Sequence, residues 1–327
     1  MLRALSVAIV IVLGGFPGAG PESAAAGSLD GLAPLTPVPD WKRVRFGNPR
    51  ALELRSQVGF VVDEREGSIL YARDADKRRP IASLTKLLTV MTLLDAKLSS
   101  QKVIEVTRKD RDRLKGSRSS LRYGTTLTRD ELMRIALVAS DNRATAALAR
   151  TYPGGPDALL RVVNEKARLL GLTQTRVADA SGLRPENVST GRDLARLAYI
   201  ARGYPSISEW STTRRFSVVD RKSGRELTFR NTNSLVHRER WDIALSKTGF
   251  TSEAGNCLLI RTTIADRPLI VVLLNSWGKR SKYGDSGRIR DWIVASERAA
   301  QAGDAGRVQP PLDQALQYPS EGLIAQR

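Results

Sequence analysis

A chain of 327 residues with 41% hydrophobic content can bury the core of one large domain or of two small ones. Its 52 lysines and arginines against 34 aspartates and glutamates give a formal net charge of +18, which favours anionic partners such as nucleic acid, phospholipid or an acidic polymer. The single cysteine, Cys257, excludes an intramolecular disulfide framework and a metal site built on thiolates, and its apolar neighbours indicate a buried side chain.

The first 26 residues have the pattern of a secretory signal peptide. The basic start Met1-Leu2-Arg3 precedes an apolar stretch over 4–13, and small residues follow at 24–26. That stretch is shorter than the roughly 20 residues of a membrane-spanning helix, although an uncleaved anchor stays open. We therefore expect a periplasmic protein, soluble or loosely associated with the membrane. Its charge would then face the anionic envelope surface and not nucleic acid.

Residues 27–50 contain Gly, Pro and basic side chains without periodicity and predict a linker before a catalytic domain over 51–300. Strands are expected near 58–62 and 68–72, joined by a hairpin loop. A helix over roughly 83–94 follows Pro80, and a short strand lies near 102–106.

The middle of the chain has no long strand pattern. Helices are expected from Thr128, with Asp130 and Glu131 in the first turn, and over 144–150, 156–170 and 191–202, the last of them after the plausible cap Ser189-Thr190. Strand patterns return at 216–220, 226–230, 244–248, 257–263 and 269–274, before a closing helix over 287–300 and a disordered tail over 301–327.

This order predicts an α/β (α+β) fold with an antiparallel sheet built from N- and C-terminal parts and flanked by helices. A helical subdomain at about 107–205 would be inserted between them. A cleft is then expected where the two parts meet.

Ser83 and Lys86 stand three residues apart at the start of the first predicted helix, which places their Cβ atoms about 5–6 Å apart. A lysine amine at that distance can activate a serine hydroxyl without histidine. The helix N-terminus would in addition suit an oxyanion. The same spacing occurs twice more, away from helix starts, at Ser99 with Lys102 and at Ser276 with Lys279.

A second motif, Ser140-Asp141-Asn142, lies between two apolar helical segments, as a turn facing a cleft would. The Ser140 hydroxyl could pass a proton to a leaving amine, and the Asn142 amide could hold a substrate carbonyl. A simple helix N-cap is the alternative, and the tripeptide alone does not decide between them.

A third motif comprises Lys247, Thr248 and Gly249, at the end of an apolar strand-like run. Lys247 near Lys86 would add a second cation and help to lower the pKa of Lys86. Lys247 and Thr248 could receive a substrate carboxylate, and Gly249 would let the strand approach the ligand closely. The similar triplet at 222–224 joins two strand-like runs and indicates a hairpin turn.

The order of these three motifs resembles the signature of the penicillin-binding proteins and serine β-lactamases. The segments 79–86, 123–128, 179–183 and 246–251 resemble the low-molecular-mass D-alanyl-D-alanine peptidases. Residues 152–155 and 252–258 look most like the D-alanyl-D-alanine endopeptidase branch of that family, and the resemblance spans about 59–275.

The resemblance implies Ser83 as the acyl-ester nucleophile, Lys86 as the general base and Ser140 as a proton relay. It implies main-chain N–H groups of Ser83 and Phe250 as the oxyanion hole. The substrate-binding residues that it implies are Asn142, Lys247, Thr248 and Gly249. No metal or cofactor is implied. The implied activity is cleavage of D-alanyl–diamino acid cross-links in peptidoglycan stem peptides, with β-lactams as covalent inhibitors.

Several alternatives stay open or are weaker. A carboxypeptidase acting on D-alanyl-D-alanine is the main rival, although that branch usually adds a C-terminal β-domain or membrane helix, and this chain ends soon after Trp292. A class A β-lactamase would need a Glu-x-x-x-Asn sequence that neither Glu165 nor Glu186 provides. A Ser-His-Asp hydrolase would have to use His237, the only histidine, without a Gly-x-Ser-x-Gly turn. A non-catalytic envelope-binding protein fits the charge but does not predict three ordered motifs.

Overall fold

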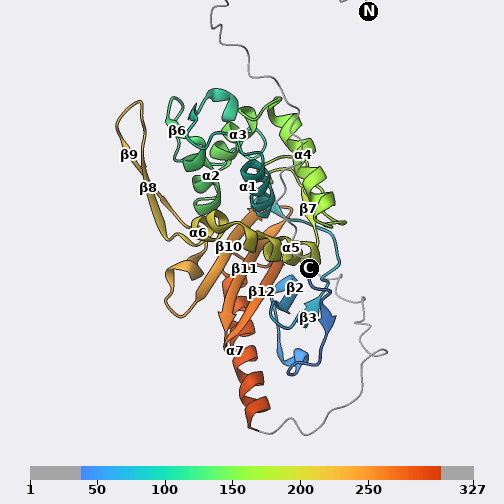
Figure 1. The fold of residues 1–327 in the computed structure, drawn as a ribbon. Coiled ribbons are helices and arrows are strands. Elements are labelled where there is room, and N and C mark those ends of the chain that lie inside the picture. Colours follow the sequence, from blue (N-terminus) through green and yellow to red (C-terminus); the bar gives the residue numbers. More distant parts are fainter. Residues whose placement is uncertain (1–37, 303–327) are drawn as a thin grey trace, which may run out of the picture.

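The computed structural model describes residues 38–302. The predicted signal over 1–26, the beginning of the predicted linker and residues 303–327 of the predicted tail lie outside the described residues. At the centre is a six-stranded sheet in the order β1-β3-β2-β12-β11-β10, with helices on both faces (Figure 1). The strands pair antiparallel except for β1, which runs parallel to β3.

Both ends of the described chain contribute to this sheet. The strands are β1 (Lys42–Arg43), β2 (Ser56–Asp63), β3 (Ser68–Arg73), β10 (Asp242–Thr251), β11 (Gly255–Ile264) and β12 (Arg267–Ser276). The join is the pairing of β2 with β12, where Val61 lies opposite Val271. The predicted antiparallel sheet, assembled from N- and C-terminal parts, is therefore confirmed.

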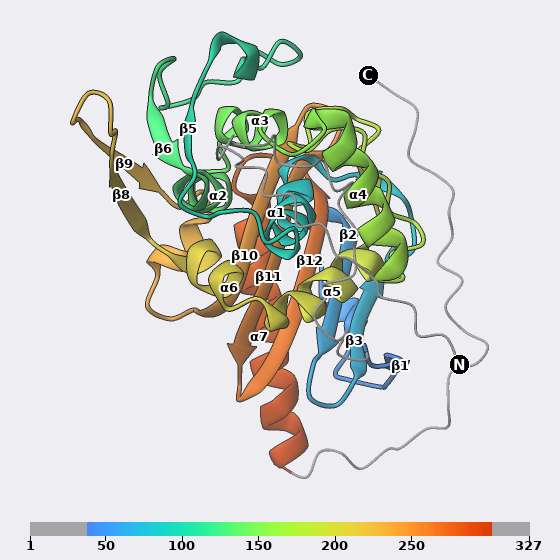
Figure 2. The same cartoon turned by 45° about the horizontal axis from the view of Figure 1, so that its top comes forward.

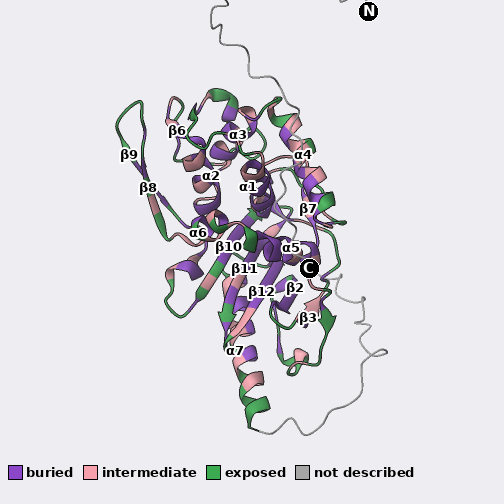
Figure 3. Cartoon of the chain, in the orientation of Figure 1, coloured by how far each residue is buried: buried purple, intermediate pink, exposed green. Residues whose placement is uncertain are grey.

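Side chains alternate between the two faces of the sheet, as the pleat requires. In β12, Ile270, Val272 and Leu274 join the larger core under the helical part of the molecule. Their neighbours in the same strand, Leu269, Val271 and Leu273, join a second core with helix α7 (Ser281–Gln301). The sheet is thus buried on both sides, with purple at its centre in Figure 3.

Helix α7 begins six residues before the predicted start at 287. Gly284 and Gly287 lower the helix propensity of this first part and hide its pattern in the sequence. The buried carboxylate of Asp285 holds it in place by accepting the main-chain N–H groups of Arg55 and Ser56, at 2.9 and 2.7 Å.

The helical part lies over the other face of the sheet (Figure 2). Its helices are α1 (Thr85–Asp95), α2 (Arg129–Val138), α3 (Asn142–Arg150), α4 (Gly155–Leu169), α5 (Gly191–Ile200) and α6 (Pro205–Thr212). Thr190 caps α5 by accepting the main-chain N–H of Asp193, as predicted, and Thr128 caps α2 in a capping box with Glu131. Helix α6 was not predicted. Helix α5 packs directly on β2, β11 and β12, so the helices of the middle segment also cover the sheet.

Short elements complete the described chain. They are the strands β4 (Arg79–Pro80), β5 (Val103–Glu105), β6 (Thr126–Thr128), β7 (Val188–Ser189), β8 (Arg215–Val219) and β9 (Glu226–Arg230), and the 3-10 turns η1 (Pro49–Ala51), η2 (Ala82–Leu84), η3 (Arg108–Asp110), η4 (Ala201–Gly203) and η5 (Ser234–His237). The β8–β9 hairpin lies at the rim of the molecule beside α2 and β6, and residues 222–224 form its turn, as predicted (Figure 2). No helix within residues 38–302 is long and apolar enough to cross a membrane.

Part of the predicted linker over 27–50 packs on the domain. Trp41 is buried, with its ring centroid 6.0 Å from that of Phe60 and 6.4 Å from that of Tyr199. Strand β1 follows it and pairs with β3. A single tryptophan and a two-residue strand produce no periodic pattern, so nothing in the sequence predicts this packing.

Candidate active site

Ser83 lies in the 3-10 turn η2, immediately before helix α1. Ala82 has a left-handed backbone with φ of +47°, which is rare for a residue with a Cβ and marks a strained turn. Gly182 packs against this turn so closely that a Cβ there would overlap the Ala82 carbonyl oxygen. The neighbouring loop thus supports the unusual backbone that presents the serine.

Lys86 directs its amine at three groups. The Nζ atom lies 2.9 Å from the Ser83 hydroxyl, 2.6 Å from Oδ1 of Asn142 and 2.6 Å from the main-chain oxygen of Ser181. The side chain is fully buried. Burial disfavours the charged form and lowers the pKa of Lys86 to about 8. Three carboxylates act in the opposite direction, those of Asp179, Asp141 and Asp112.

Ser140 and Lys247 form a second contact of the same kind. The Lys247 amine lies 2.8 Å from the Ser140 hydroxyl and 3.0 Å from the main-chain oxygen of Thr248. Ser140 occupies the turn between α2 and α3, with φ of +56°. Burial, together with repulsion from Lys86 and Lys282, holds the pKa of Lys247 well below its usual value. For Lys86, by contrast, burial is the main cause, and not the neighbouring cation that the sequence analysis expected.

The Ser-Asp-Asn tripeptide contains a helix N-cap and also contacts both lysines of the site. Asp141 is the N-cap of α3 and accepts the main-chain N–H of Ala144 at 2.9 Å. The residues on either side of it, Ser140 and Asn142, contact the two lysines. The cap therefore fixes the turn that aims its neighbours.

Strand β10 lies at the edge of the sheet and passes directly beside the serine turn. A Cβ on Gly249 would lie 2.9 Å from the Ile81 carbonyl oxygen and 3.2 Å from the Ser83 nitrogen, so only glycine fits without movement. Phe250 follows with an exposed side chain. The main chain of β10 thus adjoins the Ser83 amide, as the predicted oxyanion pair requires.

Thr248 lies on the next pleat of β10, away from Lys247. Its hydroxyl is 2.6 Å from that of Thr232, a residue that the sequence analysis did not single out. The main chain of Thr232 is bound in turn to the end of α2, through the carbonyl of Val138. The hydroxyls of Thr232 and Thr248 therefore form a hydrogen-bonded pair at the edge of the site.

The loop that supplies the Ser181 carbonyl was missed as a functional element. Its Asp179 carboxylate accepts four successive main-chain N–H groups, those of Ser181, Gly182, Leu183 and Arg184. Asn187 closes the loop by donating to the Thr85 hydroxyl at 3.0 Å and to the Asp179 carbonyl at 2.7 Å. Residues 179–183 had been noted only as a resemblance, because a contact made by a main-chain carbonyl leaves no motif.

The other candidate residues lie elsewhere. Ser99 sits in the turn after α1, and the Ser276 hydroxyl contacts that of Ser56 at 2.6 Å. The His237 ring is 3.3 Å from the Asn231 carbonyl. Cys257 is fully buried, which raises its pKa to about 11, as expected for a small core side chain.

Known proteins resemble this chain over most of its length. The family model described as D-alanyl-D-alanine carboxypeptidase matches residues 46–278. A D-alanyl-D-alanine endopeptidase of Pseudomonas aeruginosa is 41% identical over 84% of this chain and 89% of its own length. One of Escherichia coli is 38% identical over 81% and 83%. The crystal structure of the Streptomyces K15 DD-transpeptidase superimposes with a TM-score of 0.68 at 25% identity, covering 74% of this chain and 98% of that one.

Proposed function

This chain belongs to the D-alanyl-D-alanine carboxypeptidase family of peptidases, and from that premise we propose that it is a peptidoglycan D,D-endopeptidase. It cleaves the bond between D-alanine of one stem peptide and the diamino acid of another. The names of the Pseudomonas and Escherichia relatives support the choice of endopeptidase.

The observation that carries the proposal is the buried Lys86 amine beside the Ser83 hydroxyl. Neutral Lys86 takes the proton of Ser83 as the serine oxygen attacks the D-alanine carbonyl. The negative charge that develops on the carbonyl oxygen is met by the main-chain N–H groups of Ser83 and Phe250. An acyl-enzyme ester forms when the C–N bond breaks.

The leaving amine receives the proton that Lys86 took from Ser83, passed on through Ser140, whose hydroxyl contacts Lys247. Lys86 is then neutral again and takes a proton from the water molecule that attacks the ester. That proton returns to the Ser83 oxygen as the acyl product leaves. Asn142 holds a backbone carbonyl on the acyl side of the substrate. Lys247, Thr248 and Gly249 bind the leaving side along β10, whose outer edge is available for main-chain pairing.

The setting proposed for this activity is the periplasm, reached through the signal pattern over 1–26. The substrate there is an anionic cell-wall polymer, which suits the net charge of +18. β-Lactams are proposed as covalent inhibitors that acylate Ser83.

A carboxypeptidase acting on pentapeptide stems is the second candidate, favoured by the description of the matching family model. The same residues would act, and only the leaving group would differ, free D-alanine in place of a diamino acid.

Labelling with a fluorescent penicillin tests the acyl-enzyme step. The wild-type protein should give a covalent band on a denaturing gel, and Ser83→Ala should give none. Ser99→Ala is the matched control and should label as the wild type does, since Ser99 lies outside the site. An undiminished band with Ser83→Ala would refute the assignment of the nucleophile.

A further inference from the structure

A cationic hollow lies beside the proposed active site, within the segment 107–123. It has a volume of about 380 Å³ and is lined by Arg108, Arg111, Asp112, Arg113, Gly116 and Tyr123. Three guanidinium groups and one carboxylate give this lining a charge of 3 − 1 = +2. We propose that this hollow, called here the arginine hollow, binds a free carboxylate on the acyl side of the substrate peptide. This inference rests on the proposed function.

The two acidic side chains of the segment, Asp110 and Asp112, already form hydrogen bonds or ion pairs within the protein. The Asp112 carboxylate accepts the main-chain N–H groups of Leu114, Lys115 and Ser117 and the Ser117 hydroxyl, at 2.6 to 3.0 Å. Asp110 is buried and is held by Arg150 at 2.7 Å. Within residues 38–302, by contrast, Arg111 and Arg113 have no acidic side chain within ion-pair distance.

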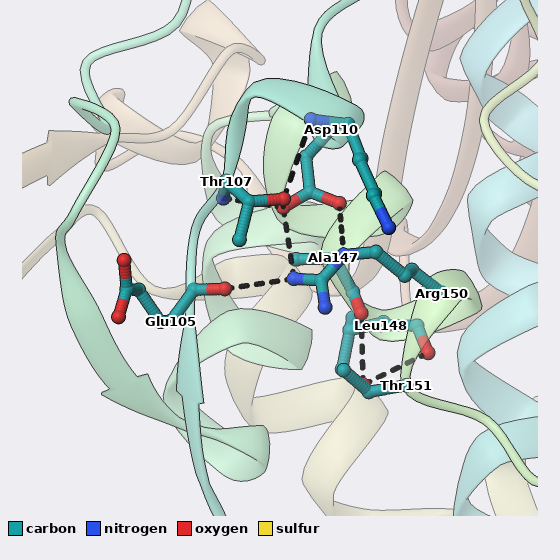
Figure 4. A network of polar contacts seen from close by, with 8 residues as sticks. Glu105, Thr107, Asp110, Ala147, Leu148, Arg150 and Thr151 are labelled. Atoms are coloured by element: carbon teal, nitrogen blue, oxygen red, sulfur yellow. Dashed lines mark hydrogen bonds and ion pairs between the residues drawn. The ribbon is translucent and has the colours of Figure 1, made fainter.

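The frame of the arginine hollow is fixed before any ligand arrives. Figure 4 shows the ion pair between the Asp110 carboxylate and Arg150 of helix α3. Arg150 also donates to the Glu105 carbonyl at 2.7 Å. Thr107 and Asp110 form a capping box at the start of the segment. Tyr123, at its end, lies under two guanidinium groups, those of Arg143 at 4.4 Å and Arg108 at 6.0 Å from the ring centroid. A preformed cationic site loses less entropy on binding.

Two contacts connect this segment with the cleft. The Asn142 amide, whose oxygen contacts Lys86, donates its N–H to the Ser117 hydroxyl at 2.8 Å. On the sheet side, Lys115 forms an ion pair with Glu253 in the turn between β10 and β11, and this contact lowers the pKa of Glu253 to about 2. The arginine hollow therefore adjoins the end of the cleft that lies beyond Asn142 and Phe250.

The direction of the substrate follows from these positions. When the leaving side lies at Lys247 and Thr248, the acyl side runs past Asn142 and along β10 towards Glu253. That path leads to the segment that carries Arg111 and Arg113. Stem peptides bear free carboxylates on their acidic and diamino acid residues, and planar guanidinium groups bind carboxylates in a bidentate manner. The arginine hollow would thus favour a stem peptide over a neutral peptide with the same D-alanyl end.

The test uses two synthetic cross-linked peptides in which D-alanine is joined to a diamino acid, and which differ only in the carboxyl of the diamino acid on the acyl side, which is free in one and amidated in the other. Wild-type protein should show a kcat/KM about fivefold higher for the free carboxylate, a factor at the upper end of what exposed charge pairs contribute. Arg111→Gln/Arg113→Gln should lose that preference. Its kcat/KM for the amidated peptide and its rate of labelling by penicillin should not change.

Arg225→Gln/Arg230→Gln removes the same charge from the exposed β8–β9 hairpin and is the matched control. It should keep the preference, because neither Arg225 nor Arg230 lines the arginine hollow. Equal kcat/KM for both peptides in the wild type, or an unchanged preference in the Arg111/Arg113 variant, would overturn the inference. If the wild type neither labels nor cleaves either peptide, the proposed function itself fails.

Discussion

The amine of Lys86 donates to the main-chain oxygen of Ser181, 2.6 Å away in a different loop. A neutral lysine amine has two N–H groups and one lone pair. The Ser181 carbonyl and the Asn142 amide oxygen are both acceptors, so they engage the two N–H groups. The lone pair is then left for the Ser83 hydroxyl, which is the orientation that a general base needs.

The pH dependence of acylation follows from the pKa of Lys86, which is about 8. Below that value most of the enzyme carries a protonated Lys86, so the second-order rate of penicillin labelling should rise about tenfold per pH unit and level off above it. Rates measured from pH 6 to pH 9.5, with circular dichroism to confirm folding at each pH, check this. A flat profile would exclude Lys86 as the base.

Removing the charge of Asp179 should shift the pH dependence of penicillin labelling. Its carboxylate raises the pKa of Lys86, so Asp179→Asn should lower the pKa and shift the midpoint of the labelling profile to lower pH. Asp193→Asn is a suitable control, because Asp193 also accepts a loop N–H, from Gln174, but is not among the groups that affect Lys86. A midpoint that moves upward, or that moves equally in both variants, would contradict the assigned role.

Gly182 should tolerate no side chain. Gly182→Ala would place a Cβ against the Ala82 carbonyl, at a φ of +82°, and we expect a loss of unfolding free energy above about 3 kcal/mol together with loss of labelling. Gly224→Ala has a similar φ of +70° but open space around it, so it should cost only about 1 kcal/mol and label normally. Chemical denaturation measures both. Equal losses would show that backbone strain alone, and not contact with Ala82, sets the requirement.

The sequence predicted those elements that have a strong local pattern. The apolar strand β2 and the capping of α5 by Thr190 are examples. Helix α6 was not predicted, because it is short and its sequence, from Pro205 to Thr212, is rich in serine and threonine.

In the site, the pairing of Ser83 with Lys86 could be predicted because helix geometry fixes the distance between residues three apart. The contact of Lys247 with Ser140, by contrast, depends on tertiary structure, and only the resemblance to a family joined the two motifs beforehand. The Ser181 carbonyl could not be found at all, since every residue has one and only the fold selects which carbonyl faces the base.

Digestion of purified cross-linked muropeptide dimers, followed by liquid chromatography and mass spectrometry, tests the proposed endopeptidase most directly. The wild-type protein should convert dimers to monomers without releasing free D-alanine from the cross-link, and Ser83→Ala should leave the dimers intact. Dimers that persist with the wild type while pentapeptide stems lose free D-alanine would contradict the proposal and assign a carboxypeptidase.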